Sequence, residues 1–149
     1  LLGYTLRGLT ECGLLLDRED CLAPVHSNLS RLLSDLESHH TLAGTYHKDW
    51  QADRSYTCLT GNLQIGIVLH RLASTISQPE TYLAPFHRLL KNVQLTQNLD
   101  SSCDGIRGGI KGSQPIWGPY QRYQYVNWAA KFFLDALLLS KHGPIPLKS

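Results

Sequence analysis

Hydrophobic positions along the chain recur with helical periods in five segments. These segments run from about Leu2 to Leu16, Asp20 to Glu37, Thr60 to Ile76, Pro79 to Gln97 and Asn127 to Ser140. In the second and fourth, apolar residues return every three or four positions on one side only, which is typical of helices with one face in water. The third has apolar residues in all directions, so we expect it to be buried on most sides, and the fifth is apolar nearly all round.

The ends of two helices carry recognisable signals. Ser77-Gln78-Pro79-Glu80 predicts a capping-box start for the fourth helix. Gly143-Pro144-Ile145-Pro146 predicts the end of the fifth.

The alternation of the two helix types predicts two layers. Helices one, three and five form an inner layer, and helices two and four an outer layer. A pentapeptide occurs twice in almost the same form, first at position 22 and again at position 83: Leu22-Ala23-Pro24-Val25-His26 and Leu83-Ala84-Pro85-Phe86-His87. Such a repeat is typical of stacked helical hairpins. We therefore predict an all-α fold, a partial α/α toroid made of hairpins. An ordinary five-helix bundle would explain the amphipathic helices but not the repeat.

Two long loops lie between the predicted helices, from His39 to Cys58 and from Asn98 to Tyr125. Both connect an outer helix to an inner one, so they are expected to emerge at the same rim, above the N-termini of the inner helices. They are rich in Trp, Tyr, His and Asp, which argues against disorder, and loops of this length in a compact domain are usually functional.

Composition narrows the range of functions. The 149 residues are 42% hydrophobic and fit one domain with a sizeable core. A net charge of +2 without a basic cluster speaks against nucleic-acid binding, and no apolar run is long enough to span a membrane. Four cysteines without metal-type spacing are expected to be free thiols in a cytoplasmic protein, and no metal or cofactor is expected.

The start of the chain suggests a fragment. Methionine is absent, and Leu1-Leu2-Gly3 already lies in an apolar helical pattern. The expected partner is either the missing N-terminal half of a toroid or a second copy of the chain, since an incomplete ring leaves apolar surface uncovered.

Several motifs together resemble a known superfamily. Cys58-Leu59-Thr60-Gly61-Asn62-Leu63-Gln64 opens the third helix, and Arg107-Gly108-Gly109-Ile110-Lys111-Gly112-Ser113-Gln114-Pro115-Ile116-Trp117-Gly118 leads into Asn127-Trp128-Ala129-Ala130-Lys131-Phe132-Phe133. These motifs look like the C-terminal part of α/α-toroid proteins of the six-hairpin and terpenoid-cyclase-like type. They resemble in particular uncharacterised bacterial proteins described as squalene-cyclase-like or prenyltransferase-like. The resemblance implies the toroid fold but little about function, because such toroids host unrelated chemistries.

The chain departs from two activities of that superfamily. Terpene cyclases of this type use an Asp-x-Asp-Asp motif, which Asp100-Ser101-Ser102-Cys103-Asp104 does not reproduce. No set of Asp, Cys and His can be assigned to the zinc site of prenyltransferases. Six-hairpin glycosidases and lyases resemble this chain in having aromatic residues and carboxylates at the pocket rim.

The first long loop contains the only candidates for catalysis. Asp49 and Asp53 could act as a paired acid and base, with Trp50 as a stacking platform for a sugar. Turn and capping roles for the two carboxylates are the alternative.

The stronger candidate is a ligand site at the first turns of two inner helices. Asn62 and Gln64 lie in one such turn, and Asn127 and Trp128 in the other. Free N–H groups there would favour an anionic or hydroxyl-rich ligand. Four residues of the second long loop could close over it: Lys111, Trp117, Tyr120 and Tyr125. In the alternative interpretation, the polar groups cap helices and the aromatic residues pack the loops.

The sequence thus supports three hypotheses for function. The first is a toroid domain that binds or processes a carbohydrate or related small polar ligand at the rim. The second is a non-catalytic helical-repeat module that binds a protein or another copy of itself. The third, a terpenoid- or prenyl-processing toroid, would need an aromatic-lined apolar cavity and an acid.

Overall fold

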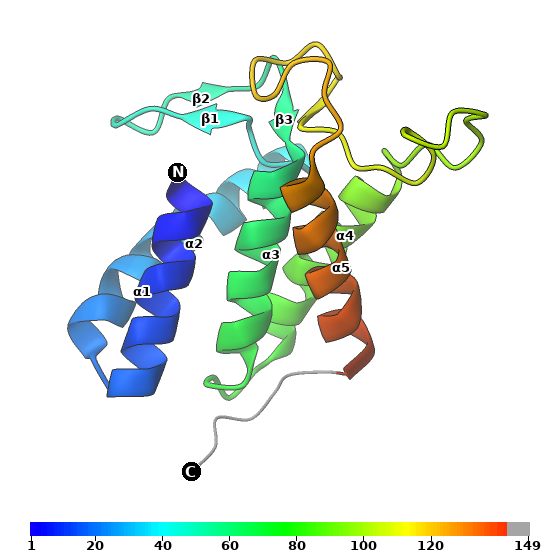
Figure 1. Ribbon diagram of the computed structural model, residues 1–149. Coiled ribbons are helices and arrows are strands. Elements are labelled where there is room, and N and C mark those ends of the chain that lie inside the picture. Colours follow the sequence, from blue (N-terminus) through cyan, green and yellow to red (C-terminus); the bar gives the residue numbers. More distant parts are fainter. Residues whose placement is uncertain (143–149) are drawn as a thin grey trace.

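The computed structural model describes residues 1–142 and is mostly helical (Figure 1). The helices are α1 (Leu2–Leu16), α2 (Glu19–His39), α3 (Leu59–Ala73), α4 (Glu80–Gln94) and α5 (Asn127–His142). Four two-residue strands lie in the loops: β1 (Thr45–Tyr46), β2 (Ala52–Asp53), β3 (Thr57–Cys58) and β4 (Ser113–Gln114). The all-α class predicted from the sequence is confirmed, and the end predicted for the fifth helix at Gly143 lies outside the described residues.

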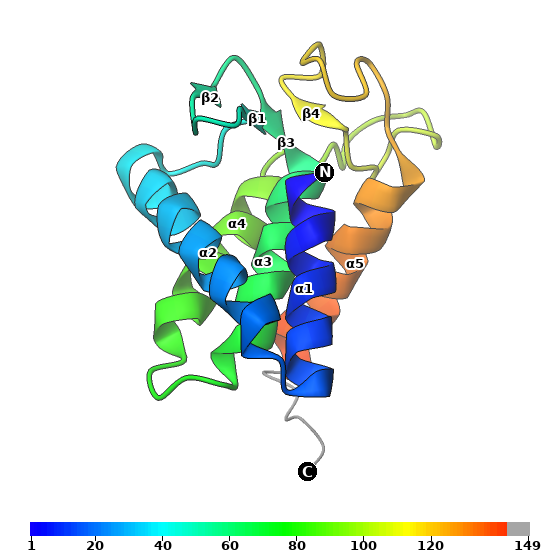
Figure 2. The same ribbon diagram turned by 90° about the vertical axis from the view of Figure 1, so that its left-hand side faces the viewer.

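The helices form two layers. α1, α3 and α5 run in the same direction side by side, with α3 in the middle, and α2 and α4 run the opposite way behind them (Figures 1 and 2). α3 packs against α1, α4 and α5, and α1 also packs against α2. Three side-chain hydrogen bonds join α2, or its C-cap His40, to α4: His26 with Tyr82, Arg88 with Glu37, and Asn92 with the His40 carbonyl.

The repeated pentapeptides occupy equivalent places in the two outer helices. Leu22–His26 lies near the start of α2 and Leu83–His87 near the start of α4, each with its proline inside the helix. Val25 and Phe86, the fourth residues of the two copies, are both fully buried. The repeat therefore marks the positions where each outer helix packs against the inner layer.

α3 is the most enclosed helix. All of its residues are buried except Gly61 and Arg71, which are partly exposed. α1 and α5 meet across it: the Tyr4 and Phe132 rings contact edge-on at 5.8 Å, and the Arg7 guanidinium lies 5.1 Å from the centre of the Phe132 ring. These contacts join α1 to α5.

Both long loops leave the same end of the helices, above the N-termini of α1, α3 and α5 (Figures 1 and 2). The first folds into an antiparallel hairpin in which Thr45 pairs with Asp53 and Tyr46 with Ala52. The second is tied to the first by the β3–β4 pair, in which Thr57 faces Gln114 and Cys58 faces Ser113. The helical periodicity gave no indication of these strands, because two residues are too few to show a period of two.

The predicted capping box at α4 is wrong. The helix begins at Glu80 after Pro79, and no side chain caps it. The carbonyl groups of Gln78 and Pro79 accept the first N–H groups of the turn instead. None of the helices in residues 1–142 is long and apolar enough to cross a membrane.

Candidate functional site

The N-terminus of α3 is anchored by both long loops. β3 leads directly into the helix, and β4 pairs with β3. The Leu59 N–H donates to the Gly112 carbonyl (3.1 Å), and the Gly61 N–H donates to Cys58 Sγ (3.4 Å). Two of the N–H groups that a helix N-terminus leaves free are therefore already bonded.

A cavity of about 270 Å³ lies beside this first turn. Its walls are the start of α1 (Leu1–Tyr4), Leu32 of α2, the segment Leu42–Tyr46 before and within β1, and five residues of α3: Thr60, Gly61, Asn62, Gln64 and Ile65. Tyr56, Cys58 and Tyr120 complete the lining near the loops. Because these segments are distant in sequence, the cavity exists only when both long loops are folded over the inner helices.

Three polar side chains of α3 that line this cavity have an unpartnered atom. Thr60, Asn62 and Gln64 are only 2%, 2% and 3% exposed. Within residues 1–142, Thr60 Oγ1, Asn62 Oδ1 and Gln64 Nε2 have no hydrogen-bond partner. A buried polar atom without a partner costs about 1–3 kcal/mol, so the cavity beside these three atoms is the candidate for a ligand site.

The orientation of Asn62 is set by the backbone. Its Nδ2 donates to the Cys58 carbonyl (2.8 Å), four residues earlier. A carbonyl oxygen can only accept, so the amide cannot be turned round without losing this bond. Asn62 therefore presents an acceptor, Oδ1, to the cavity.

Gln64 reaches its place because residue 3 is glycine. A Cβ atom at Gly3 would lie 2.4 Å from Gln64 Oε1 and 2.9 Å from Gln64 Cβ. The close approach of α1 and α3 at this point therefore requires a residue without a side chain.

Cys58 also lines the cavity, as the N-cap of α3. Burial raises the pKa of its thiol above the usual value, although the Gly61 N–H works in the opposite direction. The thiol is therefore the resting form, and a raised pKa is not that of an activated nucleophile. All four cysteines of the chain are unpaired.

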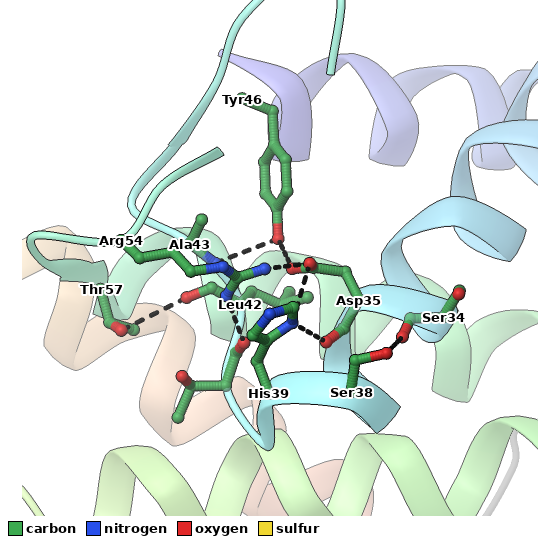
Figure 3. Close-up of polar contacts among 10 residues, drawn as sticks. Ser34, Asp35, Ser38, His39, Leu42, Ala43, Tyr46, Arg54 and Thr57 are labelled. Atoms are coloured by element: carbon green, nitrogen blue, oxygen red, sulfur yellow. Dashed lines mark hydrogen bonds and ion pairs between the residues drawn. The ribbon is translucent and has the colours of Figure 1, made fainter. Parts of the chain in front are cut away.

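The hydroxyl groups of three lining tyrosines are bonded to the protein. Tyr46 donates to Asp35 (2.5 Å) and accepts from the Ala43 N–H (3.0 Å) (Figure 3). Tyr56 bonds Thr45 Oγ1 (2.5 Å), and Tyr120 accepts from Trp128 Nε1 (3.1 Å). These tyrosines therefore contribute mainly ring surface to the cavity.

The bond from Tyr46 belongs to a cluster that holds the β1–β2 hairpin on α2. Asp35 also accepts from Arg54 and lies 3.3 Å from His39 Nδ1 (Figure 3). Burial and the hydrogen bond to Asp35 raise the pKa of Tyr46 far above its usual value. The cluster positions the Leu42–Tyr46 wall but lies behind it.

The structure brings together some of the residues predicted from the sequence. Asn62, Gln64 and Tyr120 line the cavity. Trp128, 38% exposed, is next to it through its bond to Tyr120.

Four other predicted residues are not in the cavity lining. The Lys111 ammonium donates to Gln114 Oε1 (2.6 Å), and partial burial lowers its pKa. Tyr125 forms a β-bridge with Lys111 and packs against Gly109. Trp117 is 61% exposed, and Asn127 is exposed at the first position of α5.

The carboxylates of the first loop serve their own turns. Asp49 Oδ1 accepts from the Gln51 N–H (3.2 Å), and Asp53 Oδ1 accepts from the Ser55 N–H and hydroxyl (2.9 and 2.6 Å). The bonds from Ser55 hold the pKa of Asp53 below its usual value. These are the turn and capping roles that the sequence offered as the alternative.

Trp50 is likewise part of the packing of the hairpin. Its ring contacts Tyr46 (5.6 Å between centroids), and the Arg31 guanidinium of α2 lies 5.2 Å from its centre. Trp50 faces the groove along α2 that contains Ser34 and Ser38, and does not line the cavity at α3.

Sequence reasoning missed several members of the lining. Thr60 is in the quoted motif between Cys58 and Asn62, and its polar character at the start of an otherwise apolar helix was a usable signal. Gly3 in an apolar helix was a second signal, since glycine in a helix interior often marks a close contact. No sequence signal pointed to Tyr4, Tyr46 or Tyr56, because their positions depend on how the loops fold.

The lining also limits the chemistry. Among the described residues around the cavity, none carries a charged side chain, and residues 1–142 contain no group of His, Cys, Asp and Glu that could hold a metal ion. The cavity supplies hydrogen-bond donors, acceptors and ring surface, but no acid–base pair of carboxylates.

Comparison with known proteins identifies no relative. No family model matches the chain, and neither the curated proteins nor the solved structures contain a match. The resemblance to α/α-toroid proteins therefore stays a prediction.

Proposed function

We propose that this chain is an arc of an α/α toroid that binds a small polar ligand, carbohydrate or carbohydrate-like, in the cavity at the N-terminus of α3. The observation that carries the proposal is the set of three buried, unpartnered atoms on Thr60, Asn62 and Gln64. Ligand pockets combine apolar walls with a few placed polar groups, and this lining has both.

The same observation ranks the alternatives. An apolar terpenoid would leave all three polar atoms unpaired, which disfavours the prenyl-processing hypothesis. A protein that docks on the outer surface would likewise leave these buried atoms unpaired. A polar molecule in the cavity is the occupant that could pair with these three atoms.

The two-layer packing supports the toroid part of the proposal. Parallel inner helices with antiparallel outer helices behind them, repeated by hairpins, are the arrangement that such an arc requires. Apolar residues remain exposed at both edges of the arc, Leu15 and Leu16 on α1 and Leu134 and Leu138 on α5. We propose that a second copy, or further helices of the same toroid, cover these edges, and light scattering at micromolar concentration tests self-association.

The binding proposal is tested by titration with mono- and oligosaccharides. Amide NMR shifts and tryptophan fluorescence are followed, since Trp128 is one hydrogen bond from the cavity wall. Shifts are expected at residues 60–64 and at Tyr120, with weak, micromolar to millimolar affinity.

A matched pair of variants provides the control. Asn62→Ala removes the cavity acceptor, whereas Asn28→Ala removes an asparagine that makes the same bond to a carbonyl four residues earlier (Asn28 Nδ2 to Pro24, 2.7 Å) away from the cavity. Binding is expected to weaken only in Asn62→Ala. Wild-type shifts confined to α2 and α4 would refute the site.

A further inference from the structure

Four aromatic residues of the second long loop and the first turn of α5 lie at the rim with much of their surface in solvent. They are Trp117, Tyr120, Tyr123 and Trp128, and we call them the aromatic patch. Trp117 is 61% exposed, Tyr123 67% and Trp128 38%, and Tyr120 is partly exposed. Aromatic side chains usually bury most of their large surface in a folded protein. Several exposed rings on one segment therefore indicate a surface that another molecule covers.

The four residues belong to one small region. The Tyr123 N–H donates to the Ile116 carbonyl (2.8 Å), which closes the loop that contains Trp117 and Tyr120. Trp128 Nε1 donates to the Tyr120 hydroxyl (3.1 Å), which joins the start of α5 to this loop. The loop lies above the N-termini of α3 and α5 (Figure 1).

Packing and turn geometry do not account for a tyrosine at position 123. The residue has φ 58°, in the left-handed region that bulky side chains rarely adopt and that costs free energy. Its ring gains little burial in return, because it is mostly exposed. A tyrosine at this position therefore favours a role in contact with a second molecule.

The aromatic patch is continuous with the cavity. Tyr120 lines the cavity and also bonds Trp128 of the patch. A Cβ atom at Gly118 would lie 2.7 Å from Cβ of Tyr56, so the loop packs directly on another lining residue. The buried Ser113 hydroxyl donates to the Tyr120 carbonyl (2.5 Å). The patch is thus held in place before a ligand arrives, which lowers the entropy cost of binding.

The exposed residues between the rings can form hydrogen bonds. Arg122, Gln124 and Asn127 are exposed, whereas Val126, the only branched aliphatic residue from position 117 to 128, is 7% exposed. The core of a protein–protein interface is instead mainly apolar. A sugar ring combines an apolar face, which stacks on an aromatic ring, with hydroxyl groups at its edge. The alternation of rings and polar groups therefore favours a carbohydrate over a protein as the occupant.

We propose that this site binds the end of an oligosaccharide chain, with the terminal ring in the cavity and the following rings on the aromatic patch. The inference rests on the proposed function, because it extends the ligand of the same site from one ring to a chain. A cavity of roughly 150 Å³ holds benzene, so about 270 Å³ accommodates one substituted ring. Further rings must lie outside the cavity, and Tyr120 leads from the cavity to the patch.

The test compares carbohydrates that differ in length. The full chain is titrated by amide NMR with mono-, di- and tetrasaccharides of the cello-, malto- and manno-oligosaccharide series. In at least one series, the monosaccharide is expected to shift residues 60–64, and the tetrasaccharide to shift residues 116–128 as well. The tetrasaccharide should bind at least about tenfold more tightly than the monosaccharide, since each stacked ring adds about two- to tenfold.

Substitutions at exposed positions test the patch without disturbing the core. Trp117→Ala and Tyr123→Ala should each lower the ratio of tetrasaccharide to monosaccharide affinity by about three- to tenfold. Trp117→Phe keeps an aromatic ring and should retain most of this ratio. Leu99→Ala is the control, because it truncates a similarly exposed residue (63%) of the same long loop outside the patch.

The outcomes separate this inference from the proposed function. A tetrasaccharide that binds no more tightly than its monosaccharide, with shifts confined to residues 60–64, overturns the inference and leaves the proposed function intact. Shifts at residues 116–128 without any at residues 60–64, or no shifts at millimolar concentration in any series, overturn both. An unchanged affinity ratio in Trp117→Ala and Tyr123→Ala also overturns the inference, and a loss of self-association in the same variants would identify the patch as a protein interface.

Discussion

Gln64 of α3 lies directly against Gly3 of α1, with Gln64 Oε1 2.4 Å from the position that a Cβ atom of residue 3 would take. The contact joins two walls of the cavity, because both residues line it. It also makes the position of the Gln64 amide, which lines the cavity, depend on the absence of a side chain in another helix.

Gly3→Ala is therefore expected to lower the free energy of unfolding by about 1–3 kcal/mol, since α1 or Gln64 must shift. The matched control is Gly8→Ala in the same helix, where an added Cβ meets nothing within 4 Å. It should stabilise the protein by up to about 1 kcal/mol through helix propensity. Urea unfolding of the three proteins measures the difference, and equal effects of the two substitutions would show that the contact is loose in solution.

The sequence was sufficient for the helices and for part of the site. α1 has the predicted bounds because its apolar pattern is continuous, and the other helices begin and end within a few residues of their predicted limits. Asn62 and Gln64 could be placed at a rim because their helix is apolar elsewhere and follows a long loop.

The remaining site residues could not be predicted, for a physical reason. Tyr4, Tyr46 and Tyr56 meet at the cavity through contacts between segments that are distant in sequence. Trp50 and Asp53 have the residue types of a sugar site, but local turns and Arg31 determine their positions. Residue type indicates a capability, whereas the packing of the loops decides whether it reaches the cavity.

Asp35 of α2 is expected to be the most sensitive of the polar residues that hold the β1–β2 hairpin in place. It accepts from Tyr46 and Arg54, and its side chain is only 18% exposed. Asp35→Asn keeps the shape but removes the charge that holds both donors, so it should cost about 1.5–3 kcal/mol.

Glu37→Gln is the control for this prediction. Glu37, on the same helix, pairs with Arg88 but is 78% exposed, and exposed pairs contribute about 0–1 kcal/mol. Thermal unfolding gives the stabilities, and the Tyr46 ring resonances report on the hairpin. A smaller effect of Asp35→Asn than of Glu37→Gln would contradict the cluster's role.

His70 is expected to make stability depend on pH. It is buried on α3 and contacts the Phe86 ring (4.9 Å). Burial is the main cause that lowers the pKa of His70 below 6.5, and His87 on α4 lowers it further. Below pH 6.5 the unfolded chain therefore binds more protons than the folded one.

The contribution of His70 to the free energy of unfolding should therefore be constant well above pH 6.5. It should fall as the pH drops below 6.5, by at most about 1.4 kcal/mol per pH unit. Urea unfolding between neutral and mildly acidic pH measures the loss. His70→Gln, which keeps a polar side chain but cannot be protonated, should flatten the profile. A His70 ring that titrates above 6.5 by NMR would contradict the assignment.

Thr60 connects stability with the proposed ligand. Its hydroxyl is buried beside the cavity without a partner, whereas the hydroxyl of the equally buried Thr10 donates to the Leu6 carbonyl (2.7 Å). In the absence of ligand, Thr60→Val removes a desolvated polar atom and should stabilise the protein by about 1 kcal/mol. Thr10→Val removes a formed hydrogen bond and should destabilise it by about 0.5–1.5 kcal/mol.

Both substitutions exchange one β-branched side chain for another in a helix, so they change helix propensity equally. The sign of each change in stability therefore shows whether the lost hydroxyl had a hydrogen-bond partner. Calorimetric unfolding of the ligand-free proteins provides the measurement. A ligand that bonds Thr60 stabilises the wild type increasingly as its concentration rises above its Kd, so the gain shown by Thr60→Val should shrink as the ligand is added. If Thr60→Val destabilises the protein as much as Thr10→Val does, the Thr60 hydroxyl is already hydrogen-bonded in solution. The proposed binding site would then lose one of the three groups on which it rests.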